Sequence, residues 1–389
     1  MVVADPTPVP AGSDRAGARA LRVTLVVANT FQFDSRQLRT AATLAADGHH
    51  VRILAWTAPG LPAEETLAGG LRLTRIPLDR RISSALRPLP SAARRAVCRL
   101  VALDPEATLL PPDAPRGIDR LRHPLRRLLE VLANARRVGP WADAVVAAAP
   151  ETEVFHAKAL VTLPVVREAA RRLSGRFVYD VADYHTEAAR LARMPGIVRG
   201  LVRRRERGWA RDAAGTLAVS QPIADLVRRR WGIAPPVILM NCPPAWHPAP
   251  PGRVASDLVR RTAGIPADRP VIVYQGGYSV DRGIEELVAA TGEPALRELG
   301  AVVAFMGFGR LEGWLRERAA ADPGASRDPA AGPARQLLPW TASADVTFVG
   351  QPPRPQPALQ PAQQGAFESL MAGVPVVILE GNEVVPLRR

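Results

Sequence analysis

Short apolar runs alternate with helical stretches along this chain, and this alternation limits its fold more than any other feature. The first run, residues 21–28, is predominantly apolar, as a buried parallel strand requires. A polar turn at 29–34 follows, and then a stretch that begins at Ser35, has apolar residues at helical spacing and closes at Gly48. Because residues 51–56 form the next apolar run, this order predicts an α/β domain with a parallel sheet.

The alternation continues on both sides of a proline-rich interruption. Before it, strands are expected at 153–156, 176–180, 215–219 and 236–240. Residues 243–255 are rich in proline and have no apolar periodicity, which indicates a linker between domains. After it, the expected order is a strand at 271–277, a helix at 283–291, a strand at 301–309, a helix from Gly313, and a helix and strand within 367–379.

The predicted fold class is therefore α/β, with two Rossmann-like domains facing a cleft. The expected division is a tail at 1–19, an N-terminal domain at 20–242, a linker at 243–264 and a C-terminal domain at 265–389. Ligands of such sheets bind at the carboxyl ends of the strands, so the polar residues that follow each strand are the candidates for function.

Charge and composition narrow the class of protein. The net charge is +14, and Lys158 is the only lysine among 51 basic residues. Arginines cluster at 87–137 and 199–211, either as solvated helix faces or as a surface for anionic lipid headgroups. No aromatic platform is interleaved with them, so a membrane surface is favoured and nucleic acid is not expected as a partner. No apolar run is long enough to span a membrane and no signal peptide is recognised, so the expected location is cytoplasmic, with peripheral contact to the inner face of the plasma membrane as the further interpretation.

One helical stretch, 119–133, carries leucines on one stripe and arginines on the other. The leucines are Leu121, Leu125, Leu128, Leu129 and Leu132. Such a helix can lie on a membrane, but packing of the leucines against their own domain is the favoured expectation.

The segment from Tyr274 to Gly283 carries the clearest signal for chemistry. Gly276 and Gly277 are expected at a turn from strand to helix, where backbone N–H groups can approach an anion, and Arg282 can hold a phosphate. The alternative is a tight turn with a surface arginine. A later glycine pair, Gly307 and Gly309, lacks the third glycine of a dinucleotide motif. Serine hydrolase, zincin and P-loop signatures are absent from the sequence.

Glu368 is expected to open a helix that ends at a glycine before a strand. In a cleft its carboxylate can accept hydrogen bonds from the two vicinal hydroxyls of a ribose. The alternative is simple charge complementarity with the helix dipole.

The order and content of these segments resemble family-4-type retaining glycosyltransferases of the GT-B fold. The matching pieces are the NxFxxDSR turn, VFHAKAL, FVYD, VSQPIADLV, NCPP, YQGGYSVDRGIEEL, MGFG, TASADV and FESLMAGVPVV, over residues 21–325 and 337–383. The resemblance implies a nucleoside diphosphate sugar held mainly by the C-terminal domain, an acceptor held by the N-terminal domain, no metal, and transfer with retained anomeric configuration. It implies that Gly276, Gly277 and Arg282 face the donor diphosphate and Glu368 the ribose, with Gly307 as a further donor-binding residue.

The resemblance also implies an active-site histidine at His156. Many members read H-x-H where this chain reads His156-Ala157-Lys158, so either position can do the work. Lys158 would supply positive charge, and Asp183, with His185, is a further catalytic candidate. The acceptor side would be lined by Asn29, Asp34, Ser35 and Arg36.

The sequence departs from the family pattern near its C-terminal end. The first of the family's two glutamates would fall at Gln360, in a Pro/Gln stretch at 355–365. A back-translation of that stretch, read one base later, gives LNQRFNLPNK, the loop that some branches carry. The same shift gives sensible sequence at 327–335 and 385–389, so we hypothesise single-base frameshifts and a truncated C-terminal domain. Resequencing the gene tests this hypothesis.

The sequence favours an enzyme that transfers a sugar from a UDP-, GDP- or ADP-type donor to a cell-envelope or polysaccharide acceptor. Two alternatives stay open. One is a nucleotide-sugar epimerase of the same architecture, and the other is a non-catalytic sugar-nucleotide-binding or scaffold protein.

Overall fold

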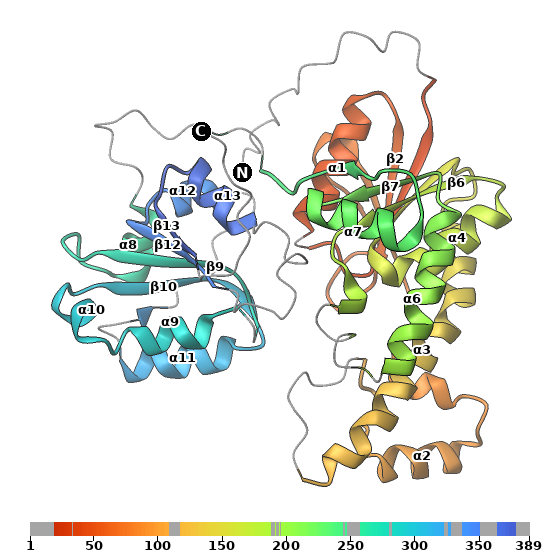
Figure 1. The fold of residues 1–389 in the computed structure, drawn as a ribbon, viewed down its shortest axis with the longest axis horizontal. Coiled ribbons are helices and arrows are strands. Elements are labelled where there is room, and N and C mark those ends of the chain that lie inside the picture. The colour runs from red at the N-terminus through yellow and green to blue at the C-terminus, as the bar shows by residue number, and fades with distance from the viewer. Residues whose placement is uncertain are drawn as a thin grey trace. The chain divides into compact units, whose positions relative to one another are not determined.

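The chain divides into two compact units, Met1–Leu239 and Met240–Arg389, which we describe separately (Figure 1). The structure is a computed structural model. It describes residues 19–32, 34–108, 117–187, 191, 194, 196–243, 246, 257–279, 282–322, 326–327, 337–350 and 364–378.

Unit 1 is built on an eight-stranded sheet with the order β3-β4-β2-β1-β5-β6-β7-β8. All neighbours pair in parallel except β3 and β4, which are antiparallel. The strands are β1 (Arg22–Val26), β2 (His50–Trp56), β3 (Glu64–Thr66), β4 (Arg72–Ile76), β5 (Val154–Lys158), β6 (Arg176–Val181), β7 (Gly215–Ala218) and β8 (Val237–Ile238). The six strands expected from the sequence of this unit are confirmed, whereas β3 and β4 were not predicted.

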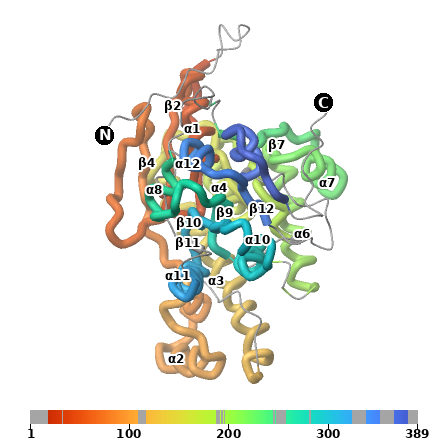
Figure 2. Tube along the Cα trace, turned by 90° about the vertical axis from the view of Figure 1, so that its left-hand side faces the viewer, coloured from red at the N-terminus to blue at the C-terminus, as the bar shows by residue number. Residues whose placement is uncertain are grey.

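Helices connect these strands and cover the sheet. They are α1 (Ser35–Ala46), α2 (Ser91–Leu100), α3 (Asp119–Ala148), α4 (Ala159–Arg172), α6 (Gly196–Arg211) and α7 (Gln221–Trp231), with short 3₁₀ turns at Ala68–Gly70, Ile82–Leu86 and His185–Glu187. Helix α1 begins where predicted because the side chain of Asp34 accepts a hydrogen bond from the backbone N–H of Gln37. Helix α4 packs on β5 and β6, and α3 packs on α4. Figures 1 and 2 show α2 and the first turns of α3 lying beyond the sheet.

Helix α3 turns most of its leucine stripe toward solvent and buries charged side chains, which is the reverse of the expectation. Leu121 is 82% exposed, and Leu125 and Leu128 are each 43% exposed. Arg127 and Glu130 are buried instead, and they form an ion pair at 2.9 Å. The expectation that the leucine stripe packs against its own domain is therefore wrong, with the exception of Leu129, which shares the buried face with the ion pair.

Unit 2 contains a five-stranded parallel sheet with the order β11-β10-β9-β12-β13. The strands are β9 (Val271–Tyr278), β10 (Val302–Gly309), β11 (Ser326–Arg327), β12 (Val346–Val349) and β13 (Val376–Ile378). The helices are α8 (Leu258–Ala263), α9 (Ile284–Ala290), α10 (Pro294–Glu298), α11 (Glu312–Ala321), α12 (Leu337–Thr341) and α13 (Gln364–Met371).

Both faces of this sheet are buried, which is why its strands read as continuous apolar runs. On β10, Val303 and Phe305 join a core with residues of α9 and α11. Val302 and Ala304 point the other way and join a second core with residues of α8 and α12.

Three features of unit 2 differ from the sequence-based expectations. Gly276 and Gly277 lie inside β9 and not in the turn after it, because β9 pairs with β10 through Tyr278. Glu368 lies in the middle of α13 and does not open it, so complementarity with the helix dipole does not explain this carboxylate. Helix α8, inside the expected linker 243–264, belongs to the core of unit 2 through Val259.

In the described ranges, no helix combines the length and the apolar character that crossing a membrane takes. Most of 327–335 and 355–365, and all of 385–389, lie outside the described residues. The frameshift hypothesis therefore stays a prediction.

Candidate active site

Each sheet has a topological switch point, where the chain connections on one side lead toward one edge of the sheet and those on the other side lead toward the opposite edge. In unit 1 this point lies between β1 and β5, because the chain builds outward from β1 on one side and from β5 on the other. In unit 2 it lies between β9 and β12 for the same reason. Open α/β sheets bind their ligands outside the carboxyl ends of strands at such a point. The residues at the ends of these four strands are therefore the candidates.

In unit 1, three predicted residues form one hydrogen-bonded group. The Nζ of Lys158, the last residue of β5, donates to Oδ1 and Oδ2 of Asp34 at 2.7 and 2.6 Å. The Nδ2 of Asn29, just after β1, donates to Oδ2 of Asp34 at 2.6 Å. The Lys158 side chain is 23% exposed and that of Asp34 only 2%, so within this ion pair the lysine is the partner that solvent or a ligand can reach. Ser35, half-buried, follows Asp34 in α1.

A second group lies around Asp180 near the end of β6, the strand beside β5. Arg36 donates to its carboxylate from Nε and Nη2, at 2.9 and 2.7 Å. Gln37 donates to the same carboxylate from Nε2 at 3.0 Å, and His156 Nε2 lies 3.4 Å from it. Burial would raise the pKa of Asp180, but the hydrogen bonds from His156 and Arg36 hold it well below its usual value. Asp180 is therefore a buried carboxylate that stays ionised and orients its donors.

This group changes the roles expected of Arg36 and His156. Arg36 is 7% exposed, and its remaining nitrogen, Nη1, donates to the backbone carbonyl of Leu239 at 2.7 Å. It is better placed to fix α1 and the end of unit 1 than to line an acceptor site. His156 is 4% exposed and lies within β5 rather than at its end, so the structure favours a positioning role for it.

Asp183 and His185 follow β6 at the same edge of the sheet. The backbone N–H of His185 donates to the carbonyl of Asp183 at 2.9 Å. Burial lowers the pKa of His185, the charge of Asp183 opposes that shift, and the charge of Lys158 adds to it. Among the described residues, Nε2 of His185 is buried and has no hydrogen-bond partner. Burial thus favours the neutral form of the ring.

The backbone is strained at two positions here, one in the connection after β1 and one at the first residue of α4. Phe31, between β1 and α1, has a φ of 65°, and Ala159, directly after Lys158, has a φ of 66°. Side chains other than glycine rarely adopt this left-handed conformation, which costs about 1–3 kcal/mol and persists where the surrounding structure requires it. The strain therefore lies beside the Asp34–Lys158 group.

In unit 2, the glycines at the end of β9 and β10 allow two strands to approach closely. A Cβ at Gly307 would lie 1.9 Å from the carbonyl oxygen of Gly276, so only glycine fits at 307. A Cβ at Gly277 would meet nothing within 4 Å, and both Gly276 and Gly277 are exposed. Gly307 thus serves strand packing, while the backbone of Gly276 and Gly277 is open to a ligand.

Arg282 follows in the connection to α9 and is exposed. The next residue, Gly283, has a φ of 68°, and a Cβ there would lie 2.9 Å from Cα of Gly350, which follows β12. This contact holds the connection after β9 against the end of β12. Burial raises the pKa of Tyr274 to about 12, and the charge of Arg282 opposes the shift.

Glu368 belongs to a chain of polar side chains behind this strand end. Gln275 Nε2 donates to its Oε2 at 3.1 Å, and Thr341 Oγ1 donates to Gln275 Oε1 at 2.5 Å. Glu368 is 5% exposed, so its orientation is fixed by buried contacts. Gln275 and Thr341 were not predicted. The sequence could have indicated Gln275, because it is a polar residue within an apolar strand. Asp180 is likewise a polar residue within a largely apolar strand.

Comparison with known proteins identifies the fold. No protein-family model matches the chain, and no curated protein matches its sequence. Among solved structures, sucrose-phosphate synthase from Thermosynechococcus elongatus matches with a TM-score of 0.59 and 17% identity over 92% of this chain and 81% of that one. HepE from Anabaena, in complex with UDP and glucose, matches with a TM-score of 0.57 and 12% identity over 95% and 83%. WaaG, a glycosyltransferase involved in lipopolysaccharide biosynthesis, matches with a TM-score of 0.53 and 15% identity over 93% and 82%.

The chain has the GT-B fold. The matches run through both units, so the predicted pair of Rossmann-like sheets is confirmed. In GT-B terms, the Asp34–Lys158 group belongs to the N-terminal sheet and the Gly276–Gly277 segment to the C-terminal sheet. In the described residues, His, Cys, Asp and Glu side chains form no group of three that would suit a metal ion.

Proposed function

We propose that this protein is a retaining glycosyltransferase that moves a sugar from a nucleoside diphosphate sugar to a cell-envelope or polysaccharide acceptor. The observation that carries the proposal is the open backbone of Gly276 and Gly277 at the topological switch point of the C-terminal sheet in a GT-B chain. The proposal is supported by the solved structures of HepE, of which one contains UDP with glucose and another UDP-glucose.

On unit 2, Arg282 and the Gly276–Gly277 backbone are proposed to hold the donor diphosphate. A guanidinium forms paired, charge-assisted hydrogen bonds to phosphate oxygens, and its charge stabilises the leaving diphosphate without a metal. Glu368, fixed by Gln275, is proposed to accept hydrogen bonds from the ribose hydroxyls.

On unit 1, Lys158 is proposed to assist at the transferred sugar, and Asp183 is proposed to contact the acceptor, with His185 beside it. Asn29, Asp34 and Ser35 complete the acceptor side, with Arg36 and His156 as positioning residues through Asp180. This division follows from exposure, because Lys158 is more accessible than its partner Asp34, whereas Asp180 is fully buried.

Calorimetric titration of UDP, GDP and ADP tests the proposal. We expect saturable binding of at least one of them, weakened by roughly tenfold or more in Arg282→Ala, since a charge-assisted hydrogen bond contributes about 1.5–3 kcal/mol. The matched control is Arg261→Ala, because Arg261 is also an exposed arginine of unit 2 but lies on α8. Saturable binding by none of the three nucleotides would overturn the proposal.

Product analysis separates a transferase from an epimerase. A transferase releases nucleoside diphosphate only when an acceptor is supplied, whereas an epimerase converts the sugar nucleotide without one. The anomeric proton signal of the product, read by NMR, tests retention of configuration.

A further inference from the structure

Helix α3 carries a stripe of leucines that stay largely exposed among the described residues of unit 1. Leu121, Leu125, Leu128 and Leu132 follow one another at helical spacing and are between 39% and 82% exposed. Along the same helix the ion pair of Arg127 with Glu130 is buried. Burying a charged pair while leaving four leucines in water costs stability, so the arrangement indicates that the leucines contact a partner.

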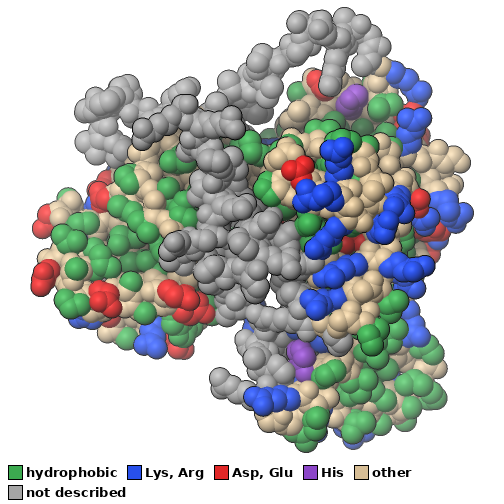
Figure 3. Space-filling view, in the orientation of Figure 1, with side chains coloured by type: hydrophobic (Ala, Val, Ile, Leu, Met, Phe, Trp, Pro, Cys, Tyr) green, Lys and Arg blue, Asp and Glu red, His purple; other side chains and the backbone are tan. Residues whose placement is uncertain are grey.

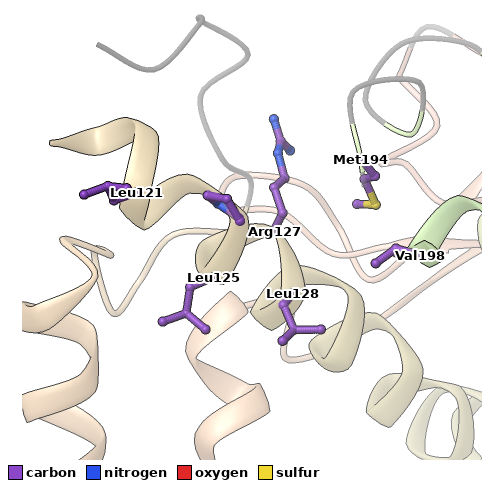
Figure 4. A pocket seen from close by; sticks show the side chains of 7 residues that line it. Leu121, Leu125, Arg127, Leu128, Met194 and Val198 are labelled. Atoms are coloured by element: carbon purple, nitrogen blue, oxygen red, sulfur yellow. The ribbon is translucent and has the colours of Figure 1, made fainter. Parts of the chain in front are cut away.

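The stripe continues onto α6. A groove of about 370 Å³ lies between the two helices, lined by Leu121, Pro124, Leu125, Arg127, Leu128, Met194 and Val198 (Figure 4). Figure 4 shows Leu125 and Leu128 on the side of α3 opposite to the guanidinium of Arg127. Ile197 and Leu201 of α6 are also exposed, at 81% and 59%.

Helix α6 is strongly basic, which favours a partner that combines apolar groups with negative charge. This helix contains six arginines and a single acidic residue, Glu206, which is fully buried. Arg204, Arg205 and Arg207 are exposed, and within the part of the chain that the structure describes they form no ion pair. Figure 3 shows hydrophobic side chains over the region of α2 and α3, next to a band of basic side chains. Exposed leucines bordered by exposed arginines fit the acyl chains and anionic headgroups of a bilayer.

We propose that the α3–α6 face, defined by Leu121, Leu125, Leu128, Ile197, Leu201 and the arginines 204, 205 and 207, docks on an anionic membrane. The groove between the helices takes part of one lipid chain, and the arginines contact the headgroups. A lipid partner is favoured over a second copy of this chain because a copy would bring the same positive charge to the contact. The inference is independent of the sugar-nucleotide proposal, since no residue of the donor site takes part.

Cosedimentation with vesicles tests the inference. We expect the full chain to bind vesicles of equal parts phosphatidylcholine and phosphatidylglycerol at low salt, and phosphatidylcholine vesicles far more weakly. Leu125→Asp with Leu128→Asp should weaken binding by at least about tenfold, since two apolar side chains are lost from the bilayer contact. The matched control Leu299→Asp changes a leucine of unit 2 that is 64% exposed and should bind as the wild type does.

A charge-reversal pair tests the headgroup contact. Arg204→Glu with Arg205→Glu should weaken binding to the anionic vesicles by at least about tenfold. Arg261→Glu with Arg297→Glu in unit 2 makes the same change of net charge and should have little effect. Because all these side chains are exposed, circular dichroism should show an unchanged fold.

Three results would overturn the inference. The first is a wild-type protein that does not bind the anionic vesicles. The second is a leucine variant that binds them as the Leu299→Asp control does. The third is a wild-type dimer in sedimentation equilibrium that Leu125→Asp with Leu128→Asp converts to monomer, because a second copy would then be the partner.

Discussion

Arg36 and Asp180 form a bidentate ion pair inside unit 1, with Nε 2.9 Å from Oδ2 and Nη2 2.7 Å from Oδ1. The pair joins the first turn of α1 to the end of β6, and His156 and Gln37 share the same carboxylate. Asp180 on β6 is thus the residue that links β6 to α1 through Arg36 and Gln37 and to β5 through His156, near the carboxyl ends of the strands.

Removing one member of this pair should destabilise unit 1. We expect Arg36→Ala to lower the free energy of unfolding by about 3–5 kcal/mol, because it leaves a buried carboxylate without its main partner. Urea denaturation followed by circular dichroism measures the loss. The control is Arg171→Ala, which removes an exposed partner of Glu168 and should leave the free energy of unfolding nearly unchanged. Similar losses in the two variants would contradict the structural role of the pair.

Buried Glu206 should make stability depend on pH. Burial raises the pKa of Glu206 from 4.5 to about 7, against the opposing hydrogen bond from Tyr179. The folded state therefore keeps this proton between pH 4.5 and 7 while the unfolded state has lost it. The free energy of unfolding must then fall as pH rises through this window, by on the order of 3 kcal/mol in total. Above pH 7, Glu206 contributes no further change with pH.

Glu206→Gln should remove this contribution. We expect the variant to be more stable than the wild type at pH 8 and to gain nothing at pH 4.5. Urea denaturation at a series of pH values gives the two curves. If they run parallel across the window, Glu206 is not the group that titrates.

Gly307 and Gly277 should respond differently to a single methyl group. In Gly307→Ala the new Cβ would overlap the Gly276 carbonyl, so we expect unit 2 to be destabilised by about 2 kcal/mol or more. Gly277→Ala meets nothing within 4 Å and should fold normally, yet weaken nucleotide binding if the diphosphate rests on this backbone. Thermal unfolding and calorimetry on both variants separate the two effects. Unchanged affinity in a well-folded Gly277→Ala protein would place the diphosphate elsewhere.

Glu368 should account for the discrimination between ribose and deoxyribose. With the nucleotide base that binds, we expect the wild type to hold the ribonucleoside diphosphate about tenfold more tightly than its 2′-deoxy analogue, as for one hydrogen bond to a charged group. In Glu368→Ala the two ligands should bind alike. The Gln275→Ala control removes only the neighbour of Glu368 and should retain part of the preference. Equal discrimination in wild type and Glu368→Ala would exclude the ribose contact.

Lys158 should affect turnover more than donor binding. It is the accessible partner in the ion pair with Asp34 and belongs to unit 1, so we expect Lys158→Ala to lower kcat by about 100-fold and to leave nucleotide affinity nearly unchanged. Lys158→Arg keeps the positive charge and should restore part of the rate. Steady-state kinetics and calorimetry give the two quantities. A loss of affinity as large as the loss of kcat would contradict this division of roles.

The sequence by itself determined the alternation of strands and helices. Buried parallel strands are mostly apolar, so runs such as 21–28 and 301–309 predicted β1 and β10. Weakly apolar strands such as β3 and β4 gave no such signal, because sheet pairing rather than local composition sets them. Asp34 and Lys158 were expected from the family resemblance, and the structure places Lys158 at the carboxyl end of β5 and Asp34 after that of the neighbouring strand β1.

Tertiary structure alone decided which of these residues face a ligand and which hold the fold. Arg36, His156 and Asp180 are far apart in sequence, and only sheet pairing brings them together and buries them. Helix α3 shows the same limit, because its periodicity defines a leucine face and a charged face but does not say which one turns inward. That choice depends on what the neighbouring elements offer to each face, and this information does not lie in the helix's own residues.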